Sequence, residues 1–275
     1  MIDSHQHFWQ VGRFDYPWMT SNLGILYRDY LPNDLISILS DNHVDKTILV
    51  QASNSVAESR WLLELASTNS FIAGVVGWVD LTSPDINTQL DELCADPKFK
   101  GVRHLVESEP SDDWLVQPAV LKGLRQLSTR GLSYDLLVHT RHLKHIPRVA
   151  ESCPDLNFVI DHLAKPPIAR NEIEEWSAAL NPLARYPNMY VKLSGLVTEA
   201  NWNSWKTDEL RPYVEIALES FGTDRMMFGS DYPVCLLAAS YDRVLDAFQE
   251  ILQELPDVDR DKIFSQNAEK FYRLN

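Results

Sequence analysis

Eight short apolar segments, rich in Val, Ile, Leu and Phe, recur along the chain and are separated by more polar stretches. Most of them are almost continuously apolar rather than alternating, which is typical of strands buried on both faces. They span residues 2–8, 46–53, 72–81, 100–106, 132–139, 157–166, 189–196 and 225–234. The pattern therefore predicts eight short, buried strands.

Segments with helical spacing lie between these strands. In residues 241–252 the apolar positions recur at three- and four-residue steps, and the opposite face is charged. Other segments of this kind span 57–68, 117–130, 142–153 and 208–221. Ser83 before Pro84 predicts a further helix start, with serine as the cap and proline in the first turn. Strands that alternate with helices predict parallel strands joined by right-handed crossovers.

Eight strand–helix units in 275 residues predict a single (β/α)8 TIM-type barrel domain over residues 1–275. The alternative is a doubly wound open sheet, which normally carries a glycine-rich dinucleotide loop after its first strand. The chain has ten glycines and no GxGxxG motif, so the barrel is favoured. Residues 14–31 form an aromatic insertion after the first strand, and residues 260–274 predict an additional C-terminal helix.

Composition and charge narrow the class of protein. A formal net charge of −14 argues against a nucleic-acid partner or an anionic membrane surface, since both need clustered Lys and Arg. The three cysteines form no CxxC pair, and no secretion signal or membrane-spanning run is present. We therefore expect a cytoplasmic protein that acts on a small molecule, and a homo-oligomer is left open.

Polar side chains gather at the C-terminal ends of the predicted strands, where barrel enzymes have their active sites. His5 and His7 are two residues apart on the first strand, so they share one face, and Asp3 is expected on that face too. The third to eighth strands contribute Trp78, Asp80, Arg103, His104, Asp135, His139, Asp161, His162, Lys165, Lys192, Ser194, Ser230 and Asp231. Because an unpaired buried charge costs several kcal/mol, this accumulation favours a functional site.

Closure of the barrel brings the eighth strand beside the first. We therefore expect His5, His7 and Asp231 to form a cluster, with His162 across the barrel mouth. Such a set can hold one divalent metal ion, or it can bind and polarise a substrate without a metal. Asp231 is the candidate general base. The alternatives are core histidines satisfied by backbone groups and a carboxylate that caps the next helix.

Five motifs in this order, DxHxH, GVRH, DHLAKP, KLSG and GSDYP, resemble the amidohydrolase superfamily. With the HFW and FDYPWM segments, they are similar to its branch of sugar lactonases, which act on L-fucono- or L-rhamnono-lactones and are related to the 2-pyrone-4,6-dicarboxylate lactonases. The resemblance implies a hydrolase of cyclic esters whose base is the aspartate after the eighth strand, Asp231.

One departure from the wider superfamily concerns the metal. Its binuclear members carry a carboxylated lysine at the end of the fourth strand, where this chain has Arg103 and His104. We therefore expect either no metal or one divalent ion, with zinc first, held by His5, His7, His162 and Asp231.

Further residues are candidates for substrate binding. Arg103 and His104 can bind the lactone carbonyl or its hydroxyls, although an internal salt bridge from Arg103 to Glu107 or Asp80 is an equal alternative. Trp9, Trp78 and the aromatic residues of the insertion can stack on a sugar face or pack the rim. His139 and His142 are weaker candidates, because a loop and a helix start both accommodate histidine.

The expected function is thus hydrolysis of an aldonolactone such as L-fuconolactone to the aldonic acid, as in L-fucose degradation. Three alternatives stay open at this point. One is a metal-dependent amidohydrolase or deaminase, and another is a zinc-dependent decarboxylase on the same barrel. The third is a sugar-binding barrel without catalysis, which has no need for a carboxylate beside two histidines.

Overall fold

The computed structural model describes residues 1–274 and contains one sheet of eight parallel strands in sequence order. Its strands are β1 (Ile2–Gln6), β2 (Lys46–Val50), β3 (Ile72–Gly77), β4 (Phe99–Leu105), β5 (Ser133–Leu137), β6 (Asn157–Ile160), β7 (Met189–Leu193) and β8 (Met226–Phe228). Each strand pairs in parallel with the next. A doubly wound sheet reverses its strand order part-way, so this order confirms the barrel.

The first and last strands meet and nearly close the barrel. The backbone N–H of Asp231 donates to the carbonyl of His5 at 2.8 Å, and that of His7 donates to the carbonyl of Tyr232 at 2.7 Å. Gln6 and Tyr232 form a parallel bridge. The residues just after β8 therefore lie against the end of β1, as closure of the barrel requires.

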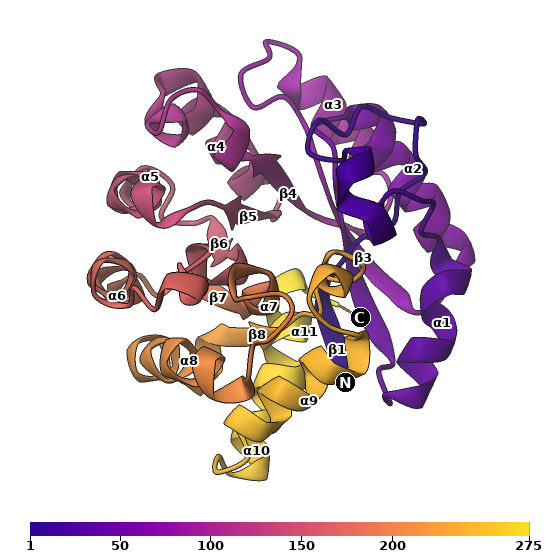
Figure 1. Ribbon diagram of the computed structural model, residues 1–275. Coiled ribbons are helices and arrows are strands. Elements are labelled where there is room, and N and C mark those ends of the chain that lie inside the picture. Colours follow the sequence, from indigo (N-terminus) through magenta and orange to yellow (C-terminus); the bar gives the residue numbers. More distant parts are fainter. Residues whose placement is uncertain (275) are drawn as a thin grey trace.

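Helices surround the strands on the outside (Figure 1). The α-helices are α1 (Pro32–Asp41), α2 (Val56–Thr68), α3 (Ile86–Leu93), α4 (Pro118–Thr129), α5 (Ile146–Ser152), α6 (Glu174–Leu180), α7 (Leu196–Glu199), α8 (Thr207–Phe221), α9 (Tyr241–Ile251), α10 (Asp257–Asp261) and α11 (Asn267–Tyr272). Helices α2, α4, α8 and α9 begin and end within one residue of the ranges predicted from periodicity. Within residues 1–274 no helix is long and apolar enough to cross a bilayer.

Two predicted helices differ from the structure. The expected helix over 142–153 is a 3-10 segment at Thr140–His145 followed by α5, which has Pro147 in its first turn. Proline is tolerated there and not in a helix interior. The helix expected from Ser83 begins only at Ile86, because Ser83 forms a turn in which its hydroxyl accepts from the N–H of Asp85.

The C-terminal segment completes the barrel interior. Residues 257–272 form α10, a π-helical turn and α11, rather than one regular helix over 260–274. Phe271 and Tyr272 pack in a cluster that we call the lower core. Its members are Ile2, Ile48, Val50, Val76, Val159, Tyr190, Met227, Ala268, Phe271 and Tyr272. The cluster fills the interior below the ionisable residues.

The insertion after β1 contains a 3-10 segment at Ser21–Leu26 and is anchored at both ends. Trp9 and Tyr30 form an antiparallel bridge, and the indole N–H of Trp18 donates to the carbonyl of Ala52 at 2.7 Å. The insertion therefore contacts the C-terminal end of β2, at the same end of the barrel as the histidines.

Candidate active site

His5 and His7 meet Asp231 at the junction of β1 and β8. Asp231 Oδ1 lies 3.4 Å from His7 Nε2 and 3.7 Å from His5 Nε2, and the two imidazole Nε2 atoms are 3.2 Å apart. All three side chains are buried. Asp231 has a left-handed backbone with φ of 58°, a conformation that non-glycine residues adopt only where the surroundings enforce it.

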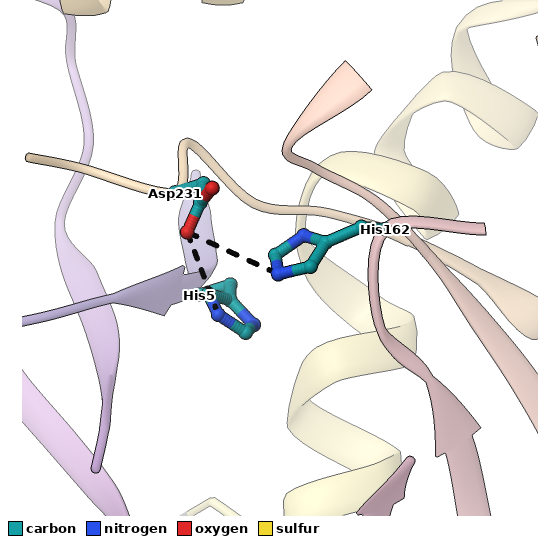
Figure 2. A group of neighbouring side chains, drawn as sticks. All are labelled: His5, His162 and Asp231. Atoms are coloured by element: carbon teal, nitrogen blue, oxygen red, sulfur yellow. Dashed lines mark ion pairs between the residues drawn. The ribbon is translucent and has the colours of Figure 1, made fainter. Parts of the chain in front are cut away.

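His162 completes the cluster from the residues that follow β6. Its Nε2 lies 4.0 Å from Asp231 Oδ1, and one donor atom from each of His5, His162 and Asp231 lies within 4.8 Å of the others (Figure 2). Its Nδ1 lies 2.9 Å from the hydroxyl of Ser194. A Cβ on Gly195 would lie 2.5 Å from this ring, so glycine there leaves the space that His162 occupies.

Asp3 does not share the face of the histidines, contrary to expectation. The β1–β2 pairing shifts between Asp3 and Gln6, so the alternation of side chains is interrupted. Asp3 instead accepts hydrogen bonds from the N–H and hydroxyl of Ser230, from Tyr241 and from the N–H of His5. Burial raises the pKa of Asp3 to about 6, although these bonds oppose the rise. Asp3 therefore joins the ends of β1 and β8 rather than entering the cavity.

A buried ionic network lies directly beneath the cluster. Lys192 Nζ lies 2.5 Å from Asp135 Oδ2, 3.0 Å from Asp161 Oδ1 and 3.1 Å from His5 Nδ1. Arg103 Nη1 lies 3.2 Å from both Asp161 Oδ2 and His5 Nε2. Two cations thus balance two carboxylates, and both cations contact His5.

Arg103 is fixed by partners that the sequence did not indicate. It pairs with Asp161, and its guanidinium also donates to the backbone and side-chain oxygens of Gln51. The alternative of a salt bridge from Arg103 to Glu107 or Asp80 is not formed. Glu107 instead pairs with Lys165, and its Oε2 lies 3.4 Å from His139 Nε2.

Burial controls the protonation of the cluster. It lowers the pKa of His5, His7 and His162, so these imidazoles are neutral at pH 7. Burial also raises the pKa of Asp231, whereas a proton on His162, His7 or His5 lowers it below its ordinary value, so the carboxylate and the imidazoles share one protonation equilibrium. His7 Nδ1 faces the carbonyl oxygen of Val50 at 2.7 Å. Because a carbonyl only accepts, Nδ1 carries the proton and Nε2 keeps its lone pair.

A cavity opens above this cluster. His7, Arg103, His162 and Asp231 border it on one side. Its other borders are formed by the apolar residues Trp18, Ala52, Leu105, Leu137 and Val234 and by the polar residues Glu107, Lys165, Thr198 and Glu199. His5 lies behind the His7, Arg103, His162 and Asp231 side of the cavity and is fully buried.

The other expected substrate contacts lie outside the cavity lining. Trp9 is fully buried and donates to the carbonyl of Arg28. Trp78 donates to His104 Nδ1, and the His104 ring stacks on Trp114 at 4.0 Å. His104 Nε2 also lies 2.6 Å from Glu109 Oε1, so these residues form a packed wall behind β4.

His139 and His142 contact each other rather than the cavity. His142 Nδ1 accepts from the backbone N–H of His139 at 3.0 Å, and its Nε2 lies 3.4 Å from Asp112 Oδ1. Their contacts join the end of β5 to the following 3-10 segment.

Two acidic residues of this end of the barrel were missed by the sequence analysis. Glu199 borders the cavity at the end of α7. Glu58 is fully buried and accepts from the backbone N–H groups of Ala52 and Ser53. The spacing of Ser55 and Glu58 matches the S-x-x-E pattern of a helix start, which could have indicated Glu58. No pattern in the sequence indicated Glu199.

Comparison with known proteins agrees with this geometry. A family model described as amidohydrolase matches residues 2–274. The chain belongs to the amidohydrolase family. It is 40% identical over 281 residues to an L-fucono-1,5-lactonase of Burkholderia ambifaria, covering 100% of this chain and 96% of that protein. It is 37% identical to an L-fucono-1,5-lactonase of Burkholderia multivorans, covering 99% and 96%.

A solved member of the family has the same architecture. A Burkholderia multivorans amidohydrolase crystallised with bound zinc superposes with a TM-score of 0.94 at 36% identity, covering 100% of this chain and 99% of the other. Within the amidohydrolase family the chain therefore groups with the sugar-lactonase branch.

The site of the present chain has side-chain donors that suit a divalent metal ion. Two imidazole nitrogens and a carboxylate, from His5, His162 and Asp231, are a ligand set typical of zinc, and catalytic zinc sites use three protein ligands. The unprotonated Nε2 of His7 faces the same carboxylate. Arg103 Nη1 competes for His5 Nε2, since the two atoms are 3.2 Å apart. These residues fit one metal ion. A second ion would need a bridging lysine at the end of β4, and β4 has none there.

Proposed function

We propose that the protein hydrolyses the ring ester of a sugar lactone to the aldonic acid, with Asp231 as the general base. The observation that carries this proposal is the position of the buried Asp231 carboxylate, which borders the cavity beside His7 and His162. The names of the relatives at 40% and 37% identity make L-fucono-1,5-lactone the first substrate to test.

Asp231 supplies the proton transfer. Its carboxylate accepts a proton from a water molecule as the water oxygen attacks the lactone carbonyl carbon. The bond between that carbon and the ring oxygen then breaks, and the proton passes from Asp231 to the ring oxygen. One water is consumed, and the products are a carboxylic acid and a hydroxyl group on the same chain.

Arg103 is suited to stabilise the negative charge that develops on the carbonyl oxygen. It borders the cavity, and Asp161 and Gln51 hold its guanidinium in place. A fixed donor needs no reorganisation when the charge forms. His7 is less suited to this role, because its proton is on the nitrogen that faces Val50.

A metal would be held by His5, His162 and Asp231, with His7 beside them. When bound, a divalent ion polarises a carbonyl and lowers the pKa of a bound water. Assay of chelator-treated enzyme with and without added zinc separates the two forms of the proposal. Loss and rescue of turnover assign these residues to metal binding, and unchanged turnover assigns them to hydrogen bonding and proton transfer.

The test of Asp231 is the substitution Asp231→Asn, which removes the base and keeps the shape. We expect kcat/KM for L-fucono-1,5-lactone to fall by roughly 100-fold or more, since general base catalysis contributes about that factor. Asp246→Asn makes the same change at an exposed position of α9 and should leave kcat/KM unchanged. If Asp231→Asn keeps more than about a tenth of the wild-type kcat/KM, the assignment of Asp231 as the general base is contradicted.

A further inference from the structure

Glu199 differs from the other charged side chains that border the cavity. Arg103 is bonded to Asp161 and Gln51, and Glu107 and Lys165 are bonded to each other. Asp231 faces the histidines. Within residues 1–274, Glu199 has neither a hydrogen bond nor an ion pair from its carboxylate. Of the charged side chains that border the cavity, it is therefore the one that pairs with no other described residue.

The position of Glu199 explains why this matters. It is half-buried at the end of α7, which begins directly after Gly195, the residue packed against His162. Its neighbour Thr198 has already donated its hydroxyl proton to the carbonyl of Gly195 at 2.7 Å. A partly desolvated carboxylate without a donor is unfavourable. A bound molecule with hydroxyl groups would remove that penalty.

The other residues that border the outer cavity are less able to accept hydrogen bonds from the hydroxyl groups of a bound molecule. Apolar surface is offered by Trp18, Leu105, Leu137 and Val234. These side chains can cover a sugar ring, but they accept no hydrogen bonds from its hydroxyls. Glu107 also accepts, but its carboxylate is engaged by Lys165 and faces His139.

We propose that Glu199 accepts hydrogen bonds from the ring hydroxyls of the substrate and selects polyhydroxylated lactones over lactones without hydroxyls. The inference rests on the proposed lactonase activity. Glu199 contacts the part of the substrate remote from the ester, so it sets specificity and takes no part in proton transfer. Burial also raises the pKa of Glu199, despite the opposing effect of Lys165, which agrees with a carboxylate kept from water.

The experiment compares two substrates in one variant. Kinetics of wild type and Glu199→Gln are measured with L-fucono-1,5-lactone and with δ-valerolactone, which has the ester but no hydroxyls. We expect kcat/KM for the hydroxylated lactone to fall by roughly tenfold, because the Gln oxygen still accepts a hydrogen bond but lacks the charge that makes such a bond about twice as strong. The change should lie mainly in KM. The kcat/KM for δ-valerolactone should be unchanged. If δ-valerolactone is turned over too slowly to assay, its inhibition constant should be unchanged instead.

Two controls separate this role from a structural one. Glu174→Gln makes the same change on the exposed face of α6 and should leave both substrates unaffected. The Tm of Glu199→Gln should equal or exceed that of wild type, because the variant loses an unpaired, half-buried charge. A lower Tm with equal losses on both lactones assigns a structural role and overturns the inference.

The remaining outcomes also decide. Equal kcat/KM of variant and wild type on the hydroxylated lactone overturns the role of Glu199 while leaving the lactonase intact. If the wild type hydrolyses neither lactone, the proposed function is overturned, and this inference falls with it.

Discussion

The two halves of the barrel interior are built from opposite kinds of residue. The lower core, with Ile48, Val159 and Phe271 among its members, is apolar. A few residues further along the strands, the interior contains Lys192, Asp135 and Asp161, all fully buried. In barrel enzymes the first half of a strand stabilises the fold, and the C-terminal end carries the chemistry.

The halves also differ in how they tolerate change. Apolar contacts in the lower core are numerous and individually weak, so the loss of one methyl group removes a small part of the total. In the upper half, each buried charge depends on one or two partners. Removing a partner leaves an uncompensated charge, which costs far more. Three substitutions test this contrast.

The largest effect is expected for Lys192→Met, which keeps the length of the side chain and removes its charge. Asp135 and Asp161 then face each other without their shared cation, and we expect the free energy of unfolding to fall by roughly 3–5 kcal/mol. Urea denaturation measures this loss. The double variant Lys192→Met/Asp135→Asn should recover part of it. A single variant within about 1 kcal/mol of wild type would show that the ionic network is dispensable.

A smaller, pH-dependent effect is expected at Glu58. Burial raises its pKa to about 8, so its stabilising contribution is fully present below the unfolded pKa of about 4.5 and is lost as pH rises through 8. The free energy of unfolding should therefore decrease across that window, by about 1.4 kcal/mol per pH unit at most. Glu58→Gln cannot ionise, so its stability should depend less on pH between 5 and 8. Denaturation curves at several pH values check this, and parallel curves for the two proteins contradict it.

The smallest effect is expected in the lower core. Ile48→Val removes one methylene from a fully buried side chain and should lower the free energy of unfolding by about 0.5–1.5 kcal/mol. Because Ile48 lies below the ionic network, kcat/KM should stay at the wild-type value. A loss of activity larger than the loss of stability would mean that the two halves are coupled.

The sequence was sufficient for the fold because the signal was repeated. Eight apolar segments and four helices with regular spacing agree with the structure, and no single segment had to be read without error. The errors fall where local context decides. Pro147 divides one helix, and the turn at Ser83 delays another. Neither was evident from hydrophobic periodicity.

The site was predictable only in part, for a related reason. Membership of the cluster follows from barrel closure, which places Asp231 beside His5 and His7. The partner of Arg103 depends instead on the register of β4 to β6, and the side of Asp3 depends on the irregularity in β1. Glu199 lies on a short helix after β7, where no periodicity indicates which side chain faces the cavity.

The position of α11 has a consequence for biosynthesis. Phe271 and Tyr272 belong to the same cluster as Ile2, and the hydroxyl of Tyr272 bonds Asp135 at 2.8 Å across 137 positions of the chain. A nascent chain therefore cannot complete its barrel interior until residues 267–272 have been translated. Up to that moment the apolar ends of the strands remain uncovered, and exposed apolar surface of this kind makes a folding intermediate prone to aggregation.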